Sequence, residues 1–359
     1  MLDARWAVAL SFALTTSLIL LLIPLARRFR LVDQPGGRKR HAAPTPLVGG
    51  FAMSLGIAVA LASTASEPGA LGPLIAGSTL LVVFGAVDDT LRLDYRARLA
   101  VQSVAAMILV FWGGLRIESL GNLFGFGSVD LGLGAVPFTI FAVVGLINAI
   151  NMLDGLDGLA GSAAFAMLGP VLVYCQLQDL DQVLLPGLAI ASSILAFLLF
   201  NYRFPWRDRA RVFMGDAGSN FLGFALAWIV LSINDDSSSG LYPISILWIL
   251  AFPVADTLST IWRRHRKRKS AFQPDHDHMH FIVQRAGFSI NTTVLIISSV
   301  TALCALAGLA GSMNKLPEPL LTLGLLFYFL AHNLLLTHAW RIAKGFRQHL
   351  TAVAEPSDD

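Results

Sequence analysis

The sequence predicts an all-α, polytopic integral membrane protein with about eleven transmembrane helices. Of its 359 residues, 55% are hydrophobic and only 14% are charged, whereas soluble domains have about 25% charged residues. The apolar residues also gather in long runs, and a run of about 20 residues can cross a bilayer as a helix. This composition excludes an ordinary soluble enzyme and a disordered chain. A soluble nucleic-acid-binding protein is disfavoured, because the net charge is only +3.

The candidate membrane helices are the apolar runs themselves, several of which are short. The first run is followed by Arg27 and Arg28 instead of a small-residue cleavage site, so we expect a retained first span and not a signal peptide. Cys175 and Cys304 lie inside apolar runs and are interpreted as packing residues. The predicted helices are 6–26, 47–65, 71–87, 99–114, 135–151, 160–177, 183–200, 219–233, 242–262, 291–311 and 319–340.

The basic residues are divided unevenly between the two sides of these predicted spans. Strict alternation places 23 of the 26 lysines and arginines on one side and leaves only Arg5, Arg116 and Lys315 on the other. Because cytoplasmic loops are enriched in Lys and Arg, we expect the N-terminus outside and the C-terminus in the cytoplasm. A single transmembrane domain, 1–344, should precede a polar cytoplasmic tail, 345–359. The predicted cytoplasmic loops that hold the organised polar residues are 27–46, 88–98, 152–159, 201–218 and 263–290.

The first polar cluster is the adjacent pair Asp88 and Asp89, at the cytoplasmic end of the third predicted helix. Adjacent carboxylates repel each other, so holding them at an apolar helix end is unfavourable unless a cation or a substrate is present. Ionisable residues at a membrane edge indicate a functional site, and the alternative is a solvated start of a loop. Arg98 follows ten residues later and is either a partner at the same edge or an interfacial anchor.

Polar residues recur at every third position in the next cluster. They are Asn148, Asn151, Asp154 and Asp157. On a continuous helix, residues three apart are neighbours, so these side chains would form one polar ridge on an apolar helix. Amide and carboxylate oxygens are suited to Mg²⁺. A polar seam between two helices is the alternative, and the two aspartates argue against it.

Asp216 lies in the turn Gly215-Asp216-Ala217-Gly218, directly before a predicted helix. A carboxylate between glycines at such a place is suited to close contact with a phosphate or a metal ion, although many turns have this composition. Phe213 precedes the turn and is either a stacking partner for a nucleobase or an interfacial anchor.

Two further loops combine histidines with basic residues. The loop 263–290 opens with a basic run that suits anionic lipid, and its alternating histidines include His278 and His280. Zinc is weakly supported there, and donation to phosphate or sugar hydroxyls is the better hypothesis. The loop 33–50 mixes proline and glycine with cations, which is typical of an anion-binding loop. Its candidate residues are Arg38, Lys39 and His41.

One further acid, Asp256, lies near the inner end of the ninth predicted helix. An ionisable residue inside a membrane helix needs a partner, so we expect it to support the site or to pair with a neighbouring cation. His332 and His338, in the last span, are interpreted as structural.

These clusters, in this order, resemble the polyprenyl-phosphate N-acetylhexosamine-1-phosphate transferases, and most closely the WecA-type enzymes. Phospho-MurNAc-pentapeptide transferase is a more distant likeness. The resemblance extends from Asp33 to about Ser289, and five matching segments at successive positions on one predicted face argue against a chance similarity. These segments are 33–50, 88–89, 148–160, 213–219 and 274–289.

The resemblance implies the transfer of GlcNAc-1-phosphate from UDP-GlcNAc to undecaprenyl phosphate, which gives undecaprenyl-diphosphate-GlcNAc and UMP. It implies Mg²⁺ or Mn²⁺, with Asn151 and Asp216 as the expected metal ligands. Asp88, Asp89 and Asp157 are the expected catalytic residues, with Asp157 also at the nucleotide. The expected substrate-binding residues are Arg38, Lys39, His41, Arg98, Asn148, Asp154, Phe213, His278 and His280.

The resemblance also implies a multi-pass protein of the bacterial cytoplasmic (inner) membrane, with its active site on the cytoplasmic face. There it would initiate a lipid-linked surface polysaccharide such as O-antigen. Membrane lipid is an expected partner, nucleic acid is not, and a homodimer is the candidate assembly. Phe281 stands where the WecA type usually has a third histidine, so another UDP-N-acetylhexosamine stays an alternative. A transporter is a more distant alternative, because its coupling acids should lie near the middle of the membrane.

Overall fold

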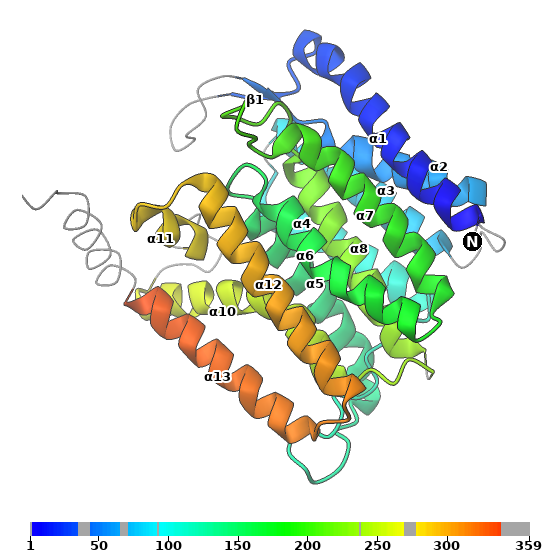
Figure 1. Cartoon of the computed structure of the whole chain (residues 1–359), viewed down its shortest axis with the longest axis vertical. Helices are drawn as coiled ribbons and strands as arrows, with labels where there is room; N and C mark the ends of the chain where they lie inside the picture. Colours follow the sequence, from blue (N-terminus) through cyan, green and yellow to red (C-terminus); the bar gives the residue numbers. More distant parts are fainter. Residues whose placement is uncertain are drawn as a thin grey trace, which may run out of the picture.

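The computed structural model describes residues 2–34, 44–64, 71–91, 93–236, 238–268 and 278–338, and these are mostly helical (Figure 1). The predicted helical class is therefore confirmed, with one addition: two short strands pair antiparallel on either side of the loop that contains Arg38. The elements are α1 Leu2–Arg28, β1 Val32–Asp33, β2 Thr45–Pro46, α2 Gly49–Thr64, α3 Gly72–Leu91, α4 Tyr95–Met107, the π-helix η2 Ile108–Trp112, the 3₁₀ helix η3 Gly132–Gly134, α5 Ala135–Leu153, α6 Leu159–Leu177, α7 Asp181–Asn201, α8 Gly215–Asp235, α9 Pro243–Ile249, α10 Ala251–Arg266, α11 Met279–Arg285, α12 Ile290–Met313 and α13 Glu318–Thr337.

Eight helices within the described ranges are long and apolar enough to cross a membrane, so the chain is a polytopic membrane protein. The bent pair α9 and α10 is a ninth candidate. The other two predicted spans correspond to α2, which has 16 residues, and to α4, which has 13 and continues into η2. Neither reaches the length of the other eight, so the count of eleven stays a prediction.

The ninth predicted helix, 242–262, is wrong as a single straight element. It is broken between Ile249 and Ala251, and its halves α9 and α10 are bent by 76°. Pro253 explains the break, because a continuous helix would bring its ring against the carbonyl of Ile249, four residues earlier. In the first turn of a new helix the proline is tolerated, because the N–H groups of that turn have no partner within the helix and proline has no N–H to donate. The break turns α10 away from the direction of α9.

Helix α8 is the central element of the bundle. Its apolar window is 89% buried, compared with 17% for α1 and 22% for α13. It packs against α2, α3, α5 and α7. Figure 1 shows α1 and α13 on opposite flanks of the bundle. Since α8 is covered on several sides, groups at its first turn can be reached from several neighbouring helices at once.

Helices α3 and α8 approach each other at backbone distance, which only a glycine allows. A Cβ atom added to Gly85 of α3 would lie 2.4 Å from the Cα atom of Ala217 of α8. Gly85 lies six residues before the end of α3 at Leu91, and Ala217 lies in the first turn of α8. This contact therefore fixes how close the polar end of α3 lies to the polar start of α8.

Replacing Gly85 with alanine should lower the melting temperature of the protein. The added methyl group overlaps the α8 backbone, and such overpacking destabilises by about 1–3 kcal/mol. Gly145→Ala, in α5, is the matched control, because an added Cβ there meets nothing within 4 Å and alanine favours helix. Both variants should be melted in the same detergent. Equal melting temperatures would show that α3 and α8 tolerate separation at Gly85.

Candidate active site

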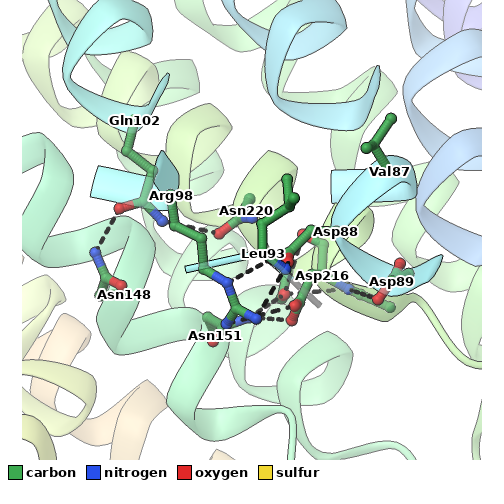
Figure 2. Close-up of polar contacts among 12 residues, drawn as sticks. Val87, Asp88, Asp89, Leu93, Arg98, Gln102, Asn148, Asn151, Asp216 and Asn220 are labelled. Carbon is green, nitrogen blue, oxygen red and sulfur yellow. Dashed lines mark hydrogen bonds and ion pairs between the residues drawn. The ribbon is translucent and has the colours of Figure 1, made fainter. Parts of the chain in front are cut away.

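Polar residues from the ends of four helices meet at one end of the bundle (Figure 2). Asp88 and Asp89 close α3, Arg98 lies in α4, Asn151 lies in the last turn of α5 and Asp216 lies in the first turn of α8. Hydrogen bonds and ion pairs connect them, so the predicted meeting of these distant segments is found in the described chain. Asp216 lies inside α8 and not in a turn before it. The helix begins at Gly215, whereas the sequence predicted a start at residue 219.

Asp88 holds the guanidinium group of Arg98. Its Oδ2 is 2.5 Å from Arg98 Nε, and its Oδ1 accepts hydrogen bonds from Arg98 Nη2 at 3.2 Å and from the Leu93 backbone N–H at 2.7 Å. The Asp88 side chain is fully buried, whereas 37% of the Arg98 side chain is exposed. A buried carboxylate needs such partners, because leaving it uncompensated is strongly destabilising. Asp88 therefore fixes the direction of an accessible cation.

Asp89 binds the start of α8 across the helix interface. Its Oδ1 accepts a hydrogen bond of 3.0 Å from the backbone N–H of Asp216. The first backbone N–H groups of a helix have no partner within the helix, and the helix dipole favours a negative charge there. A carboxylate from α3 thus takes the place of a local cap on α8. The two members of the aspartate pair have different partners, Arg98 for one and α8 for the other.

Asp216 is a partly exposed acid at the centre of the site. Its side chain is 28% exposed, and its Oδ2 lies 3.7 Å from Arg98 Nη1. Asn151 Nδ2 donates to Asp216 Oδ1 at 2.9 Å and to Ser219 Oγ at 2.8 Å. The two residues predicted as metal ligands are therefore direct neighbours, and their oxygens are of the hard type that Mg²⁺ prefers.

A chain of hydrogen-bonded amides lies beside the acids (Figure 2). Asn148 Nδ2 donates to Gln102 Oε1 at 2.7 Å, and Gln102 Nε2 donates to Asn220 Oδ1 at 3.2 Å. Gln102 and Asn220 are buried. Asn148, predicted to bind substrate, thus joins α5 to α4 and α8. The sequence analysis missed the other two amides, although each lies four residues after a predicted site residue, Arg98 or Asp216, and so on the same helix face.

The prediction that four polar residues form one ridge on a helix is wrong for the last two, Asp154 and Asp157. Helix α5 ends at Leu153, so Asp154 and Asp157 lie in the turn that follows. Asp157 Oδ2 accepts hydrogen bonds from Arg203 Nε at 2.8 Å and from the Ala210 backbone N–H at 3.0 Å. The turn therefore binds the loop between α7 and α8. Arg203 belongs to the predicted cytoplasmic loop 201–218, but no motif in the sequence singles it out.

Asp154 lies half-buried in the same turn. Burial, followed by the negative charges of Asp216, Asp89 and Asp157, raises the pKa of its carboxyl to about 7. An acid that resists ionisation beside other acids is typical of a site prepared for a cation. Asp154 thus belongs electrostatically to the cluster.

Phe213 connects the site to the predicted anion-binding loop 33–50. Its backbone N–H donates to Pro46 O at 2.9 Å, and its carbonyl accepts from the Gly49 N–H at 3.0 Å. The Phe213 ring is half-buried. The start of α2 is therefore bound to the segment that leads into α8. Three residues predicted for this loop, Arg38, Lys39 and His41, lie outside the described residues.

The two histidines lie at the start of α11, and one of them reaches the site. A Cβ atom added to Gly155 would lie 2.4 Å from His280 Nε2, so the buried His280 ring packs directly on the turn after α5. His278 is also buried, and its Nδ1 lies 2.7 Å from Asp256 Oδ2. Asp256 therefore has a buried histidine as its partner.

Changing Asp154 to asparagine should stabilise the metal-free protein at alkaline pH. A carboxyl whose pKa rises from 3.8 to about 7 on folding costs folded stability as the pH increases through this range. In EDTA, the gain in melting temperature of Asp154→Asn over wild type should be largest near pH 8 and should shrink towards pH 5. The exposed Asp130→Asn is the control. A gain that does not depend on pH would contradict this assignment.

Comparison with known proteins identifies the family. Residues 71–234 match glycosyl transferase family 4. The chain is 33% identical over 333 residues to an undecaprenyl-phosphate alpha-N-acetylglucosaminyl 1-phosphate transferase of Haemophilus influenzae, covering 92% of this chain and 93% of the relative. It is 34% identical over 336 residues to the protein of that name from Pasteurella multocida, covering 92% of each chain.

A third relative with the same name, from Escherichia coli K12, is 33% identical over 341 residues, covering 94% of this chain and 92% of the relative. The matches extend well beyond the segments that hold the polar clusters and include most of the chain. The resemblance drawn from the sequence motifs is confirmed: the chain belongs to glycosyl transferase family 4, the family of these bacterial transferases.

Proposed function

We propose that this protein transfers GlcNAc-1-phosphate from UDP-GlcNAc to undecaprenyl phosphate, releasing UMP. The observation that supports this most directly is the cluster of Asp88, Asp89 and Asp216 around Arg98 at one end of a membrane bundle. Transfer between two phosphates depends mainly on alignment and on neutralising charge, and both acids and cations are present for this purpose. The names of the relatives point to the same substrates.

The membrane arrangement belongs to the proposal. We propose that α2, α4 with η2, and the broken pair α9 and α10 cross the bilayer along with the eight long helices, which gives eleven spans. The charge bias in the sequence then puts the acid cluster at the cytoplasmic face, where the nucleotide sugar is available. The lipid phosphate reaches the same interface from within the inner membrane. The product would start a lipid-linked surface polysaccharide.

Asp216 and Asn151 are the proposed Mg²⁺ ligands, and their side chains fit this ion. Asp216 is partly exposed, and a half-turn of the Asn151 amide would bring its oxygen where Nδ2 now lies. Within the described ranges, no group of three His, Cys, Asp or Glu side chains is arranged to hold a metal. Water and substrate phosphates would therefore complete the coordination, as is usual for Mg²⁺. The bound ion would supply positive charge to the donor diphosphate.

Arg98 and Asp89 are suited to the acceptor phosphate. Asp88 fixes the guanidinium group of Arg98, so its exposed part can bind phosphate oxygens without losing its direction. Asp89 is less buried than Asp88 and is the carboxylate of the pair that can orient the acceptor. A phosphate monoester is already largely ionised near pH 7. Its position therefore matters more than removal of a proton.

The nucleotide half of the donor is assigned to the loops around the cluster. Phe213, three residues before Asp216, is the proposed stacking partner for the uracil ring. Asp157, bound to Arg203 and Ala210, holds the loop between α7 and α8 in place beside it. The turn at Asp154 and the histidines of α11 are the proposed contacts for the sugar phosphate.

Purified protein with undecaprenyl phosphate should release UMP from UDP-GlcNAc and should stop doing so in excess EDTA. Adding Mg²⁺ back should restore release, because the donor set suits this ion. UMP release from UDP-GalNAc and UDP-glucose, measured in parallel, shows which sugar nucleotide is the donor. Release only from another UDP-sugar would overturn the proposed donor, and full release in EDTA would overturn the metal.

Asp216→Asn should reduce UMP release by about 100-fold or more, a loss typical of removing one electrostatic group from an active site. The protein should still insert and elute as wild type in size-exclusion chromatography, because the amide occupies the same volume. Asp235→Asn, at the opposite end of α8 and exposed, is the matched control and should keep full activity. Wild-type activity of purified Asp216→Asn would refute its role as a ligand.

A further inference from the structure

A groove lies on the outside of the bundle, where α10 packs against α13 (Figure 1). Its volume is about 500 Å³, and its lining residues within the described chain all belong to these two helices. Leu258 and Trp262 line it from α10 and are 51% and 56% exposed, and Phe329 and Asn333 line it from α13. Because α13 is one of the candidate membrane spans, the groove opens towards the bilayer.

The groove is separate from the candidate active site. Asp256 and Thr260 of α10 contact the start of α11, which leads to the active-site turn. At 3.6 residues per turn, Leu258, Trp262 and His265 fall on the other side of α10, and these three line the groove. No lining residue in the described ranges belongs to the acid cluster.

One end of the groove is strongly basic. His265 lines the groove there and is exposed, as are Arg266 and Arg268. The sequence contains no Asp or Glu from residue 257 to residue 274. The charge at this end is therefore positive, and we call residues 263–268 the basic end of α10. Its members are Arg263, Arg264, His265, Arg266, Lys267 and Arg268.

Trp262 indicates where this end lies in the membrane. Tryptophan rings are enriched at the level of the lipid headgroups, because they are apolar with one polar N–H. The centre of the Trp262 ring lies 6.4 Å from the centre of the His265 ring, the first histidine of the basic end. Leu258 and Phe329, further along the groove, are apolar. The groove therefore extends from the level of the acyl chains to the level of the headgroups.

We propose that this groove binds one anionic phospholipid, with an acyl chain against Leu258 and Phe329 and its phosphate against the basic end of α10. Within a bilayer, an apolar wall is no better a partner for an acyl chain than other lipid tails are. The choice of lipid must therefore come from the headgroup, and Lys and Arg near the membrane surface attract anionic lipids. The amide of Asn333, in the wall of the groove, can donate to an ester carbonyl.

A phospholipid fits this place better than the undecaprenyl phosphate of the proposed reaction. The groove has a limited volume, which suits a single acyl chain and not the much longer undecaprenyl chain. The acceptor phosphate must also reach Arg98 and Asp216, whereas the groove lies on the side of α10 that faces away from α11. The groove thus receives a lipid that is not consumed by the enzyme.

Quenching of Trp262 fluorescence tests this site in the full-length protein. The protein is placed in phosphatidylcholine vesicles that contain a minor fraction of phosphatidylglycerol brominated near the top of its acyl chains. The emission of Trp262 is the difference between wild type and Trp262→Phe. Brominated phosphatidylglycerol should quench it more than the same fraction of brominated phosphatidylcholine does, and high salt should remove this excess by screening. Equal quenching by the two lipids would overturn the inference.

Substituting exposed cations measures the contact with the headgroup. The combined change Arg266→Gln and Arg268→Gln should weaken the apparent affinity for phosphatidylglycerol by about 10–30-fold, since each arginine near the surface attracts the anionic lipid. This affinity comes from quenching over a range of lipid fractions, in each variant with and without Trp262. Arg27→Gln with Arg28→Gln, exposed at the end of α1, is the matched control. An equal effect of the two pairs would contradict a headgroup site at α10.

Filling the groove distinguishes a bound lipid from a diffuse attraction to the basic end. Ser259→Phe places a ring in the groove and should abolish the excess quenching, whereas Val83→Phe, at an exposed position of α3, should not. If Ser259→Phe does not insert, Asn333→Phe fills the groove from its other wall. Excess quenching that survives in the filled groove, or that an equal amount of undecaprenyl phosphate removes, would also overturn the inference. UMP release is not measured here, so failure of the proposed function would leave this result unchanged.

Discussion

The first turn of α8 governs the arrangement of this protein, because it is both the start of the most buried candidate span and the place of Asp216, a partly exposed site acid. Unpaired N–H groups at a buried helix start must be satisfied. Here a carboxylate of α3, Asp89, does this from a neighbouring helix. The close backbone contact at Gly85 makes that reach possible. The hydrogen bond from the Asp216 N–H to Asp89 thus satisfies the start of α8 and also brings the acids of α3 and α8 together.

The polar groups around this turn are held as a network and not as separate side chains. Asp88 and Arg98 neutralise each other, and Gln102 connects the amides of Asn148 and Asn220. Hydrogen bonds are strong in a low-dielectric bundle, and an unpaired buried group is correspondingly unfavourable. Each member therefore restrains its neighbours, which keeps Asp216 and Arg98 in place before any substrate binds.

The break between α9 and α10 also affects both the path of the chain and its polar contacts. It turns the second half of this span by 76°, and it leaves Asp256 in contact with elements that follow much later in the chain, α11 and α13. Helix α11 also lies against the turn after α5, where His280 meets Gly155. An acid in one helix fragment and a glycine in a turn together determine where the histidines lie.

The sequence alone determined the class of the protein and the positions of most of its helical runs, because hydrophobic length is a local property. Asp88, Asn151 and Asp216 could be selected as acids and amides at apolar helix ends. Their partners could not be, since ion pairs such as Asp88–Arg98, Asp157–Arg203 and Asp256–His278 depend on which helices pack together. The break beside Pro253 also followed from packing and backbone geometry. The tertiary structure decided these features because a buried polar group must find its partner in space, whatever its distance along the chain.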